Sequence, residues 1–124
     1  MDRLWMVMGG TLGFLTVAGG AFGAHALKDH LTPEQLVTYE VGTRYGQIHA
    51  VLLIVVALLA ARQPTAAANV AGVSLSVGIV LFTGSLWMLS VFQIRWFGPI
   101  TPLGGLALLI GWAALVFAGV RGGA

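Results

Sequence analysis

The chain has 124 residues, of which 58% are hydrophobic and 8% are charged, and its net charge is +2. An average soluble domain carries roughly 25% charged residues, so this composition predicts one all-α membrane domain over residues 1–124. The absence of cysteine excludes disulfides, thiolate metal sites and a cysteine nucleophile. The six Lys and Arg residues form no run or patch, which excludes nucleic acid as a partner.

The first expected membrane span covers residues 4–24, which carry no charged side chain. About 21 residues at ~1.5 Å each reach roughly 31 Å, enough to cross a hydrocarbon core of ~30 Å. Residues 24–26 have the A-x-A pattern of a signal-peptidase site, but the apolar stretch is longer than a signal sequence needs, so we expect a retained helix. A small-residue stripe on one face predicts close packing: Gly9, Gly13, Thr16 and Gly20.

A second helix is expected to begin after a capping box formed by Thr32 and Gln35. Its first part, residues 33–44, is amphipathic and is expected to start along the membrane interface. Glu40 and Arg44 belong to the polar stripe of this segment. They are spaced one turn apart, which favours an ion pair.

The second membrane span is expected at residues 42–61, because the apolar run before Arg62 is too short to cross a bilayer alone. This start brings Arg44 and Gln47 to the edge of the hydrocarbon, where an arginine can extend toward the headgroups. His49 lies deeper in the span. The helical period places it on a packing face together with Gly42, Gly46 and Leu53.

The third and fourth spans are expected at residues 70–92 and 103–120. Thr101 and Pro102 predict the cap and first position of the fourth helix. Trp112 falls in mid-membrane, where its indole N–H needs an acceptor, and a serine or a backbone carbonyl of a neighbouring helix is expected. Further small residues expected at helix contacts are Gly72, Ser76 and Thr83 in the third span and Gly104, Gly105, Ala107, Gly111, Ala114 and Ala118 in the fourth.

The orientation is weakly determined by the basic residues. With four spans both termini lie on one side, and the basic residues split evenly: Arg3, Arg62 and Arg121 against Lys28, Arg44 and Arg95. Arg44 counts less toward the orientation if it is half-buried and paired. We therefore expect both termini in the cytoplasm, with the protein in a bacterial inner membrane.

Four separated motifs carry a family resemblance. They are GAFGAH from residue 20, YGQIHA from residue 45, FTGSL from residue 82 and GPITPLGG from residue 98. Together and in this order they resemble the domain of unknown function 423 family, small bacterial membrane proteins related to the eukaryotic transmembrane protein 256. The resemblance covers nearly the whole chain. It implies a four-span membrane protein and brings no activity with it.

Two groups of polar residues are candidate sites. Glu40, Arg44, Gln47 and Tyr45 are candidates for binding a lipid headgroup or a substrate, because an arginine fork matches phosphate. The favoured alternative is an interfacial helix with a surface ion pair and no ligand.

The histidines form the second group. His49 and His25 are the intramembrane polar candidates. His49 is a candidate for proton transfer, although a histidine that is simply bonded to a neighbouring helix is the favoured alternative. His25, His30 and His49 show no ligand spacing for a metal, so neither a metal nor another cofactor is expected. Whether His25 and His49 meet is left open by the sequence.

Three functions remain as hypotheses. An accessory or lipid-interacting protein, packed through small-residue stripes into a homo-oligomer or a membrane complex, is favoured because the stripes exceed what one bundle needs. A transporter or channel for a small solute, ion or proton is the alternative, and it would use His49 and the Glu40/Arg44 region. An enzyme ranks last, because no nucleophile, carboxylate pair or metal motif is present in the sequence.

Overall fold

The computed structural model describes residues 1–122, which form four long α-helices and a short 3-10 turn. Each long helix has the length and apolar composition needed to cross a membrane. The expected all-α membrane architecture is thereby confirmed. The elements are α1 (Asp2–His25), α2 (Pro33–Arg62), α3 (Ala66–Phe92), η1 (Arg95–Phe97) and α4 (Ile100–Gly122).

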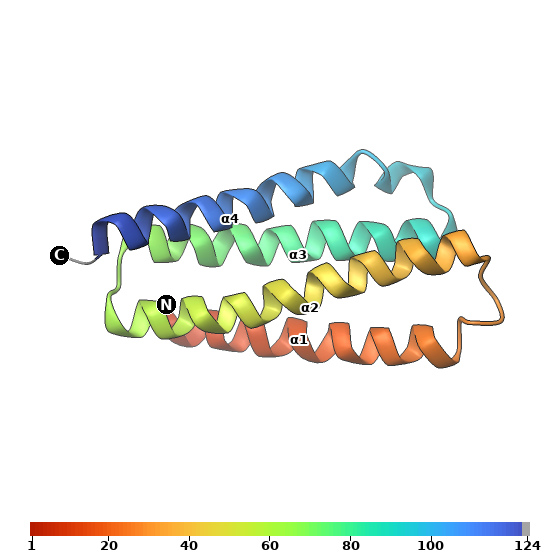
Figure 1. Cartoon of the computed structure of the whole chain (residues 1–124), viewed down its shortest axis with the longest axis horizontal. Coiled ribbons are helices and arrows are strands. Elements are labelled where there is room, and N and C mark those ends of the chain that lie inside the picture. The colour runs from red at the N-terminus through yellow and green to blue at the C-terminus, as the bar shows by residue number, and fades with distance from the viewer. Residues whose placement is uncertain (123–124) are drawn as a thin grey trace.

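Consecutive helices run in opposite directions and pack against each other in the order of the sequence (Figure 1). The middle positions belong to α2 and α3, while α1 and α4 lie at the two edges (Figure 1). The start of α1 and the end of α4 lie at the same end of the molecule. This order follows from the short connections, because a few residues can join only neighbouring antiparallel helices.

Side-chain caps set the starts of the two central helices. The Thr32 hydroxyl accepts from the Gln35 amide N–H at 3.2 Å, and the Gln35 side chain accepts from the Thr32 N–H at 2.8 Å. This reciprocal pair is the capping box expected from the sequence. The Thr65 hydroxyl starts α3 by accepting from the Ala68 amide at 3.2 Å. Gln93 ends α3 in the left-handed region, with a φ of 55°.

The second helix is continuous from Pro33 to Arg62, 30 residues or about 45 Å. Residues 33–44, expected along the interface, are its first three turns and form no separate helix. Tyr39 on these turns is buried against the neighbouring helices. The segment is therefore held in line with the rest of α2 by packing.

The fourth helix begins at Ile100, earlier than expected, so Thr101 is not its N-cap. The Thr101 hydroxyl donates instead to the Phe97 carbonyl at 3.1 Å and lies 2.6 Å from the Ser85 hydroxyl of α3. Pro102 is accommodated inside the first turn, because the N–H groups of a first turn have no acceptor within the helix.

Small residues bring the third and fourth helices together. A Cβ on Gly78 would lie 2.6 Å from a Leu108 methyl, and one on Gly104 would collide with the backbone of Phe82. Trp5 of α1 packs in the same manner over Gly72 of α3. The buried core runs through these contacts.

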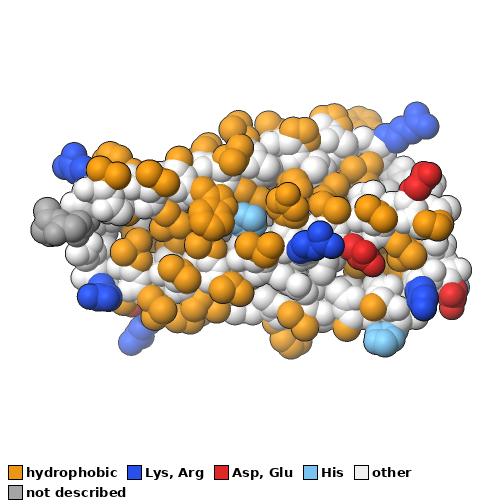
Figure 2. Space-filling view, viewed as in Figure 1, with side chains coloured by type: hydrophobic (Ala, Val, Ile, Leu, Met, Phe, Trp, Pro, Cys, Tyr) orange, Lys and Arg blue, Asp and Glu red, His pale blue; other side chains and the backbone are white. Residues whose placement is uncertain are grey.

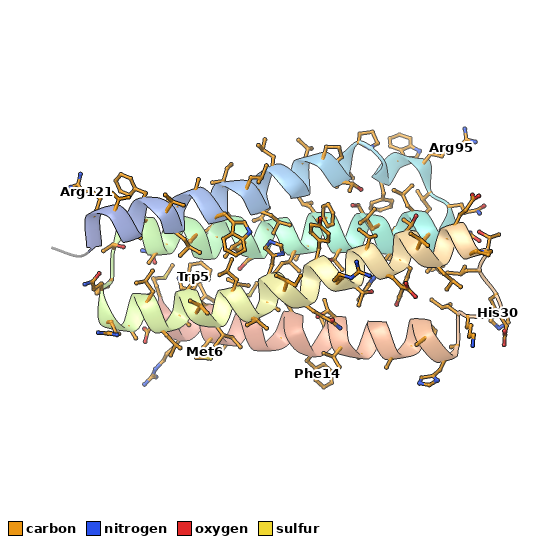
Figure 3. All side chains as sticks on the ribbon, in the orientation of Figure 1. Trp5, Met6, Phe14, His30, Arg95 and Arg121 are labelled. Atoms are coloured by element: carbon orange, nitrogen blue, oxygen red, sulfur yellow. The ribbon has the colours of Figure 1, made fainter. Side chains whose placement is uncertain are left out.

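On the face shown in Figure 2, the surface between the two ends is mostly apolar. Phe14 is 74% exposed and projects away from the helices (Figure 3). Basic side chains gather mainly toward the ends, and Arg95 and Arg121 lie at opposite ends (Figures 2 and 3). An apolar middle with charged ends is the pattern that a bilayer requires.

Candidate functional site

The second helix carries every candidate residue except His25, and a groove runs along each of its sides. One groove lies between α2 and α4 and has a volume of about 550 Å³. The other lies between α1 and α2 and has a polar part of about 220 Å³ and an apolar part of about 360 Å³. The exposed ridge of α2, which includes Arg44, Tyr45, Ile48 and Val51, separates them.

The groove between α2 and α4 is almost entirely apolar. Tyr45 and His49 line it from α2, Phe82 lines it from α3, and Trp112 closes it from α4. The Tyr45 ring packs against Phe82 with centroids 4.9 Å apart and stacks on His49 at 6.1 Å. No Lys, Arg, Asp or Glu of the described chain lines this groove.

His49 is buried and both of its ring nitrogens are engaged. Nδ1 lies 2.6 Å from the Tyr45 carbonyl oxygen, and Nε2 lies 3.0 Å from Nε1 of Trp112. A carbonyl oxygen only accepts and an indole N–H only donates, so the ring proton is on Nδ1 and Nε2 is the acceptor. His49 is neutral in this arrangement, and protonation of Nε2 would break its bond to Trp112.

The acceptor for Trp112 differs from the expected serine or carbonyl. A serine or carbonyl of a helix is normally engaged with its own helix, whereas the free lone pair of His49 Nε2 faces α4. His49 thus links α2 to α4, and it lies on the packing face predicted from the sequence, with Gly42, Gly46 and Leu53 buried beside it.

The polar part of the groove between α1 and α2 contains the remaining candidates. Glu40, Arg44 and Gln47 line it from α2, and Gly20 and Gly23 line it from α1. The Gln47 side chain is half-buried and donates to the Thr16 carbonyl of α1 at 3.4 Å. Gln47 therefore faces α1 rather than open water.

The expected ion pair between Glu40 and Arg44 is not formed. Among residues 1–122 the ion pair present joins the terminal amine to Asp2 at 3.8 Å. Both Glu40 and Arg44 are exposed, and an exposed pair gains little energy while it immobilises two long side chains. A basic and an acidic side chain lie near each other away from the molecule's ends (Figure 2). Two opposite charges therefore stay available to a ligand.

The apolar part of the same groove adjoins the polar part. Gln47 lines both parts, and Ala50, Val51 and Ile54 continue along α2. The α1 side is hollowed by glycines: a Cβ on Gly10 would meet no atom within 4 Å, and one on Gly13 would lie 3.7 Å from Ala50. The two parts thus adjoin at Gln47, with charged side chains on one side of it and apolar side chains on the other.

The change in polarity falls near the expected boundary of the hydrocarbon. Arg44 and Arg62 are 18 positions apart, about 27 Å along a helix, and a bilayer core is ~30 Å thick. On α1, Gly20 faces Thr43 and is 17 positions from Arg3, about 25 Å. Both distances place the polar part at headgroup depth when Arg3 and Arg62 mark the opposite boundary.

A polar network behind this groove was not predicted from the sequence. The Tyr39 hydroxyl donates to the Gly19 carbonyl at 2.6 Å, and its ring stacks on Trp87 at 5.3 Å. Trp87 Nε1 donates to the Thr43 hydroxyl at 2.9 Å, and Thr43 donates to the Tyr39 carbonyl at 3.0 Å. The sequence did contain one indication of this network. Gly19 and Gly23 lie one turn apart on α1, and each makes room for one of these two rings.

His25 lies apart from His49. It is exposed at the end of α1, whereas His49 is buried and bonded to Tyr45 and Trp112. His30 is exposed in the connection to α2, near the end that carries Arg95 (Figure 3). Within residues 1–122 no three His, Asp or Glu side chains are grouped for a metal ion.

Most of the glycines expected at helix contacts do face a neighbouring helix. Gly9 lies against Leu53 and Ile54, Gly46 lies between Thr16 and Thr83, and Gly42 lies against Leu86. Gly111 and Gly104 lie against α3. Gly13 and Gly105 make only looser contacts, with Ala50 and Phe82.

Comparison with known proteins identifies the family. The sequence model described as "Protein of unknown function (DUF423)" matches residues 19–105. The chain belongs to this family. UPF0382 membrane protein YwdK of Bacillus subtilis is 41% identical over 120 residues, which cover 96% of this chain and 98% of the relative. UPF0382 inner membrane protein YgdD of Escherichia coli is 31% identical over 120 residues, which cover 97% and 92%. No solved structure matches the chain.

The DUF423 resemblance expected from four motifs is therefore confirmed, and the structure shows where those motifs lie. Three of them meet at the α2–α4 groove, through Tyr45 and His49, Phe82, and Pro102 with Gly105. The remaining motif supplies Gly20 and Gly23 to the α1–α2 groove, where Gln47 of the second motif also lies. The motifs of this DUF423 protein thus map onto the two grooves along α2.

Proposed function

We propose that this DUF423 protein binds a phospholipid in the groove between α1 and α2. The observation that carries the proposal is the change of that groove from charged to apolar at Gln47, near the hydrocarbon boundary. A phospholipid changes from headgroup to acyl chain at the same depth. The groove therefore offers each half of the lipid a matching surface.

The glycines of α1 support the same proposal. Gly10 has open space where its side chain would be, and Gly13 has only a loose contact with Ala50. Glycine lowers helix stability, and at an open position no close helix contact offsets that loss. Here both glycines leave room beside Phe14 and Val17, in the apolar part of the groove.

The other hypotheses have less support. An oligomer was expected because the small-residue stripes exceeded what one bundle needs, yet Gly9, Gly46 and Gly111 are filled by side chains of the same chain. A proton pathway through His49 would have to break its bond to Trp112. The α2–α4 groove offers no charged side chain within the described chain to hold a headgroup.

We also propose that the protein lies in a bacterial inner membrane with both termini in the cytoplasm. Arg44 sits at the groove rather than in a loop, so it counts little for orientation. Arg3, Arg62 and Arg121 then outnumber Lys28 and Arg95, and the excess of basic residues marks the cytoplasmic side. Labelling of a single cysteine placed at Gln63 in sealed inverted vesicles tests this: a membrane-impermeant maleimide should label it there, and protection there would refute the orientation.

Lipid carried through purification tests the binding proposal. The protein is extracted in a mild detergent, and bound phospholipid per chain is counted by native mass spectrometry. Gly10→Leu and Gly13→Leu fill the apolar part of the groove, whereas Gly119→Leu adds the same side chain to an exposed position on α4 with equally open space.

We expect the unmodified chain and Gly119→Leu to keep one phospholipid and the two groove variants to lose it. Circular dichroism of each variant confirms that the helices are intact. Equal retention in all four proteins, or no phospholipid on the unmodified chain, would refute the proposal.

A further inference from the structure

We infer that the lipid held in the α1–α2 groove has a zwitterionic headgroup of the phosphoethanolamine class, with its phosphate on Arg44 and its primary ammonium on Glu40. This inference rests on the proposed function. It starts from two opposite charges in one groove that form no ion pair with each other or with another residue of the described chain.

The order of the two charges along α2 matches the order of groups in such a lipid. The apolar part of the groove lies deepest, Arg44 comes next beyond Gln47, and Glu40 lies one turn further out. Four residues of an α-helix rise about 6 Å. From the acyl chains outward, a phosphoethanolamine lipid presents first its phosphate and then its ammonium. The reverse order of charges in the protein would place a carboxylate against the phosphate.

The chemistry of each side chain suits its proposed partner. A guanidinium presents a planar fork of N–H donors that fits two phosphate oxygens. A carboxylate accepts hydrogen bonds from a primary ammonium, which has three N–H donors. A quaternary ammonium has no N–H donor and is held by open aromatic rings, but Tyr39, the aromatic residue that lines the polar part of this groove, stacks on Trp87.

Headgroups without a cation fit less well. In an anionic glycerol headgroup the phosphate would still reach Arg44, but Glu40 would remain unpaired one turn away and would repel the negative charge. Glu40 therefore disfavours both other headgroups. It repels an anionic headgroup, and it receives no hydrogen bond from a choline headgroup.

Binding of three phospholipids with the same acyl chains tests the inference. Lipids with ethanolamine, choline and glycerol headgroups are titrated onto the delipidated full chain in detergent, and their affinities are compared by native mass spectrometry. We expect the ethanolamine lipid to bind about tenfold more tightly than the other two, the effect of one additional charged hydrogen bond.

Three variants assign the preference to its residues. Glu40→Gln should reduce the affinity for the ethanolamine lipid to that for the choline lipid, and Arg44→Gln should weaken all three lipids. Exchange of the charges, Glu40→Arg with Arg44→Glu, keeps the composition and should abolish the preference. Glu34→Gln removes an exposed carboxylate of the same helix outside the groove and should change nothing.

The outcomes separate this inference from the proposed function. If Gly10→Leu still prevents retention but the three lipids bind equally, or the glycerol lipid binds best, lipid binding stands and the headgroup assignment is wrong. An ethanolamine preference that survives Glu40→Gln or the charge exchange also overturns the assignment. If no lipid binds the unmodified chain, the proposed function fails first.

Discussion

The α3–α4 interface and the α1–α2 groove are both rich in glycine, but they use it in opposite ways. Between α3 and α4, Gly78 and Gly104 are filled by Leu108 and Phe82 of the facing helix. In the apolar part of the α1–α2 groove, Gly10 faces open space. Glycine in the first region allows close contact between helices, and in the second it leaves a hollow that the chain does not fill.

This difference separates packing from binding. A glycine whose missing side chain is replaced by a neighbour contributes to stability through close contact. A glycine beside a hollow contributes nothing to packing, so its presence needs another explanation. Substitutions that add atoms at the two kinds of position should therefore have different effects.

The largest effect is expected for Gly104→Ala. The new methyl group would collide with the backbone of Phe82, which cannot rotate away as a side chain can. We expect a loss of about 1–3 kcal/mol in the free energy of unfolding, measured by denaturation with a strong detergent. The same substitution at Gly119 meets no atom within 4 Å and is the control. Equal stability of both variants would show that α3 and α4 are less tightly packed than described.

Trp112→Phe should have the next largest effect. It removes the donor to His49 and leaves a buried ring nitrogen without a partner. We expect a loss of about 1–2 kcal/mol, which the additional change His49→Phe should partly restore, because both polar atoms are then absent. Simple additivity of the two substitutions in the double-mutant cycle would mean that this hydrogen bond contributes nothing to stability.

Thr43→Val should cost less. The valine keeps the shape of the side chain but can no longer accept from Trp87 Nε1. Hydrogen bonds between membrane helices contribute ~0.6 kcal/mol on average, and a loss of about that size is expected in the same denaturation measurement. Thr38→Val is the control. It removes a hydroxyl that donates an exposed hydrogen bond to the Glu34 carbonyl of the same helix, and it should be neutral. A cost as large at Thr38 as at Thr43 would count against the network.

The smallest effect on stability is expected for Gly10→Ala. The methyl group enters open space, so the change in unfolding free energy should stay within about 0.5 kcal/mol or be slightly favourable because alanine favours a helix. The variant is compared with Gly104→Ala in the same denaturant series. A loss at Gly10 as large as that at Gly104 would remove the distinction between a filled and an open glycine.

The sequence was sufficient for the number of membrane-crossing helices, the capping box at Thr32 and the packing face of His49. These features depend on local composition, on a three-residue spacing and on the helical period, all of which are visible in one segment. The same local reasoning placed Gly46 at a helix contact, where Thr16 and Thr83 now lie. Features that depend on neighbours within one helix are therefore readable without a structure.

Contacts between distant segments were not predictable. His49 and Trp112 are 63 positions apart, and the acceptor for the indole was wrongly expected to be a serine or a carbonyl. The Glu40–Arg44 pair was wrong for a different reason. Its spacing permits an ion pair, but at an exposed position the gain does not offset the loss of side-chain freedom. The α1–α2 groove was also missed, because a hollow depends on two helices at once.

Photocrosslinking in a bilayer tests the central claim most directly. The protein is reconstituted with a phospholipid that carries a diazirine on its acyl chain, irradiated, and digested, and the crosslinked residues are mapped by mass spectrometry. We predict that crosslinks concentrate on the groove residues Phe14, Val17 and Val51, and that Gly10→Leu removes this concentration without removing crosslinks elsewhere. Crosslinks spread over all exposed apolar side chains in proportion to their exposure, with α4 labelled as strongly as the groove, would contradict a specific lipid site between α1 and α2.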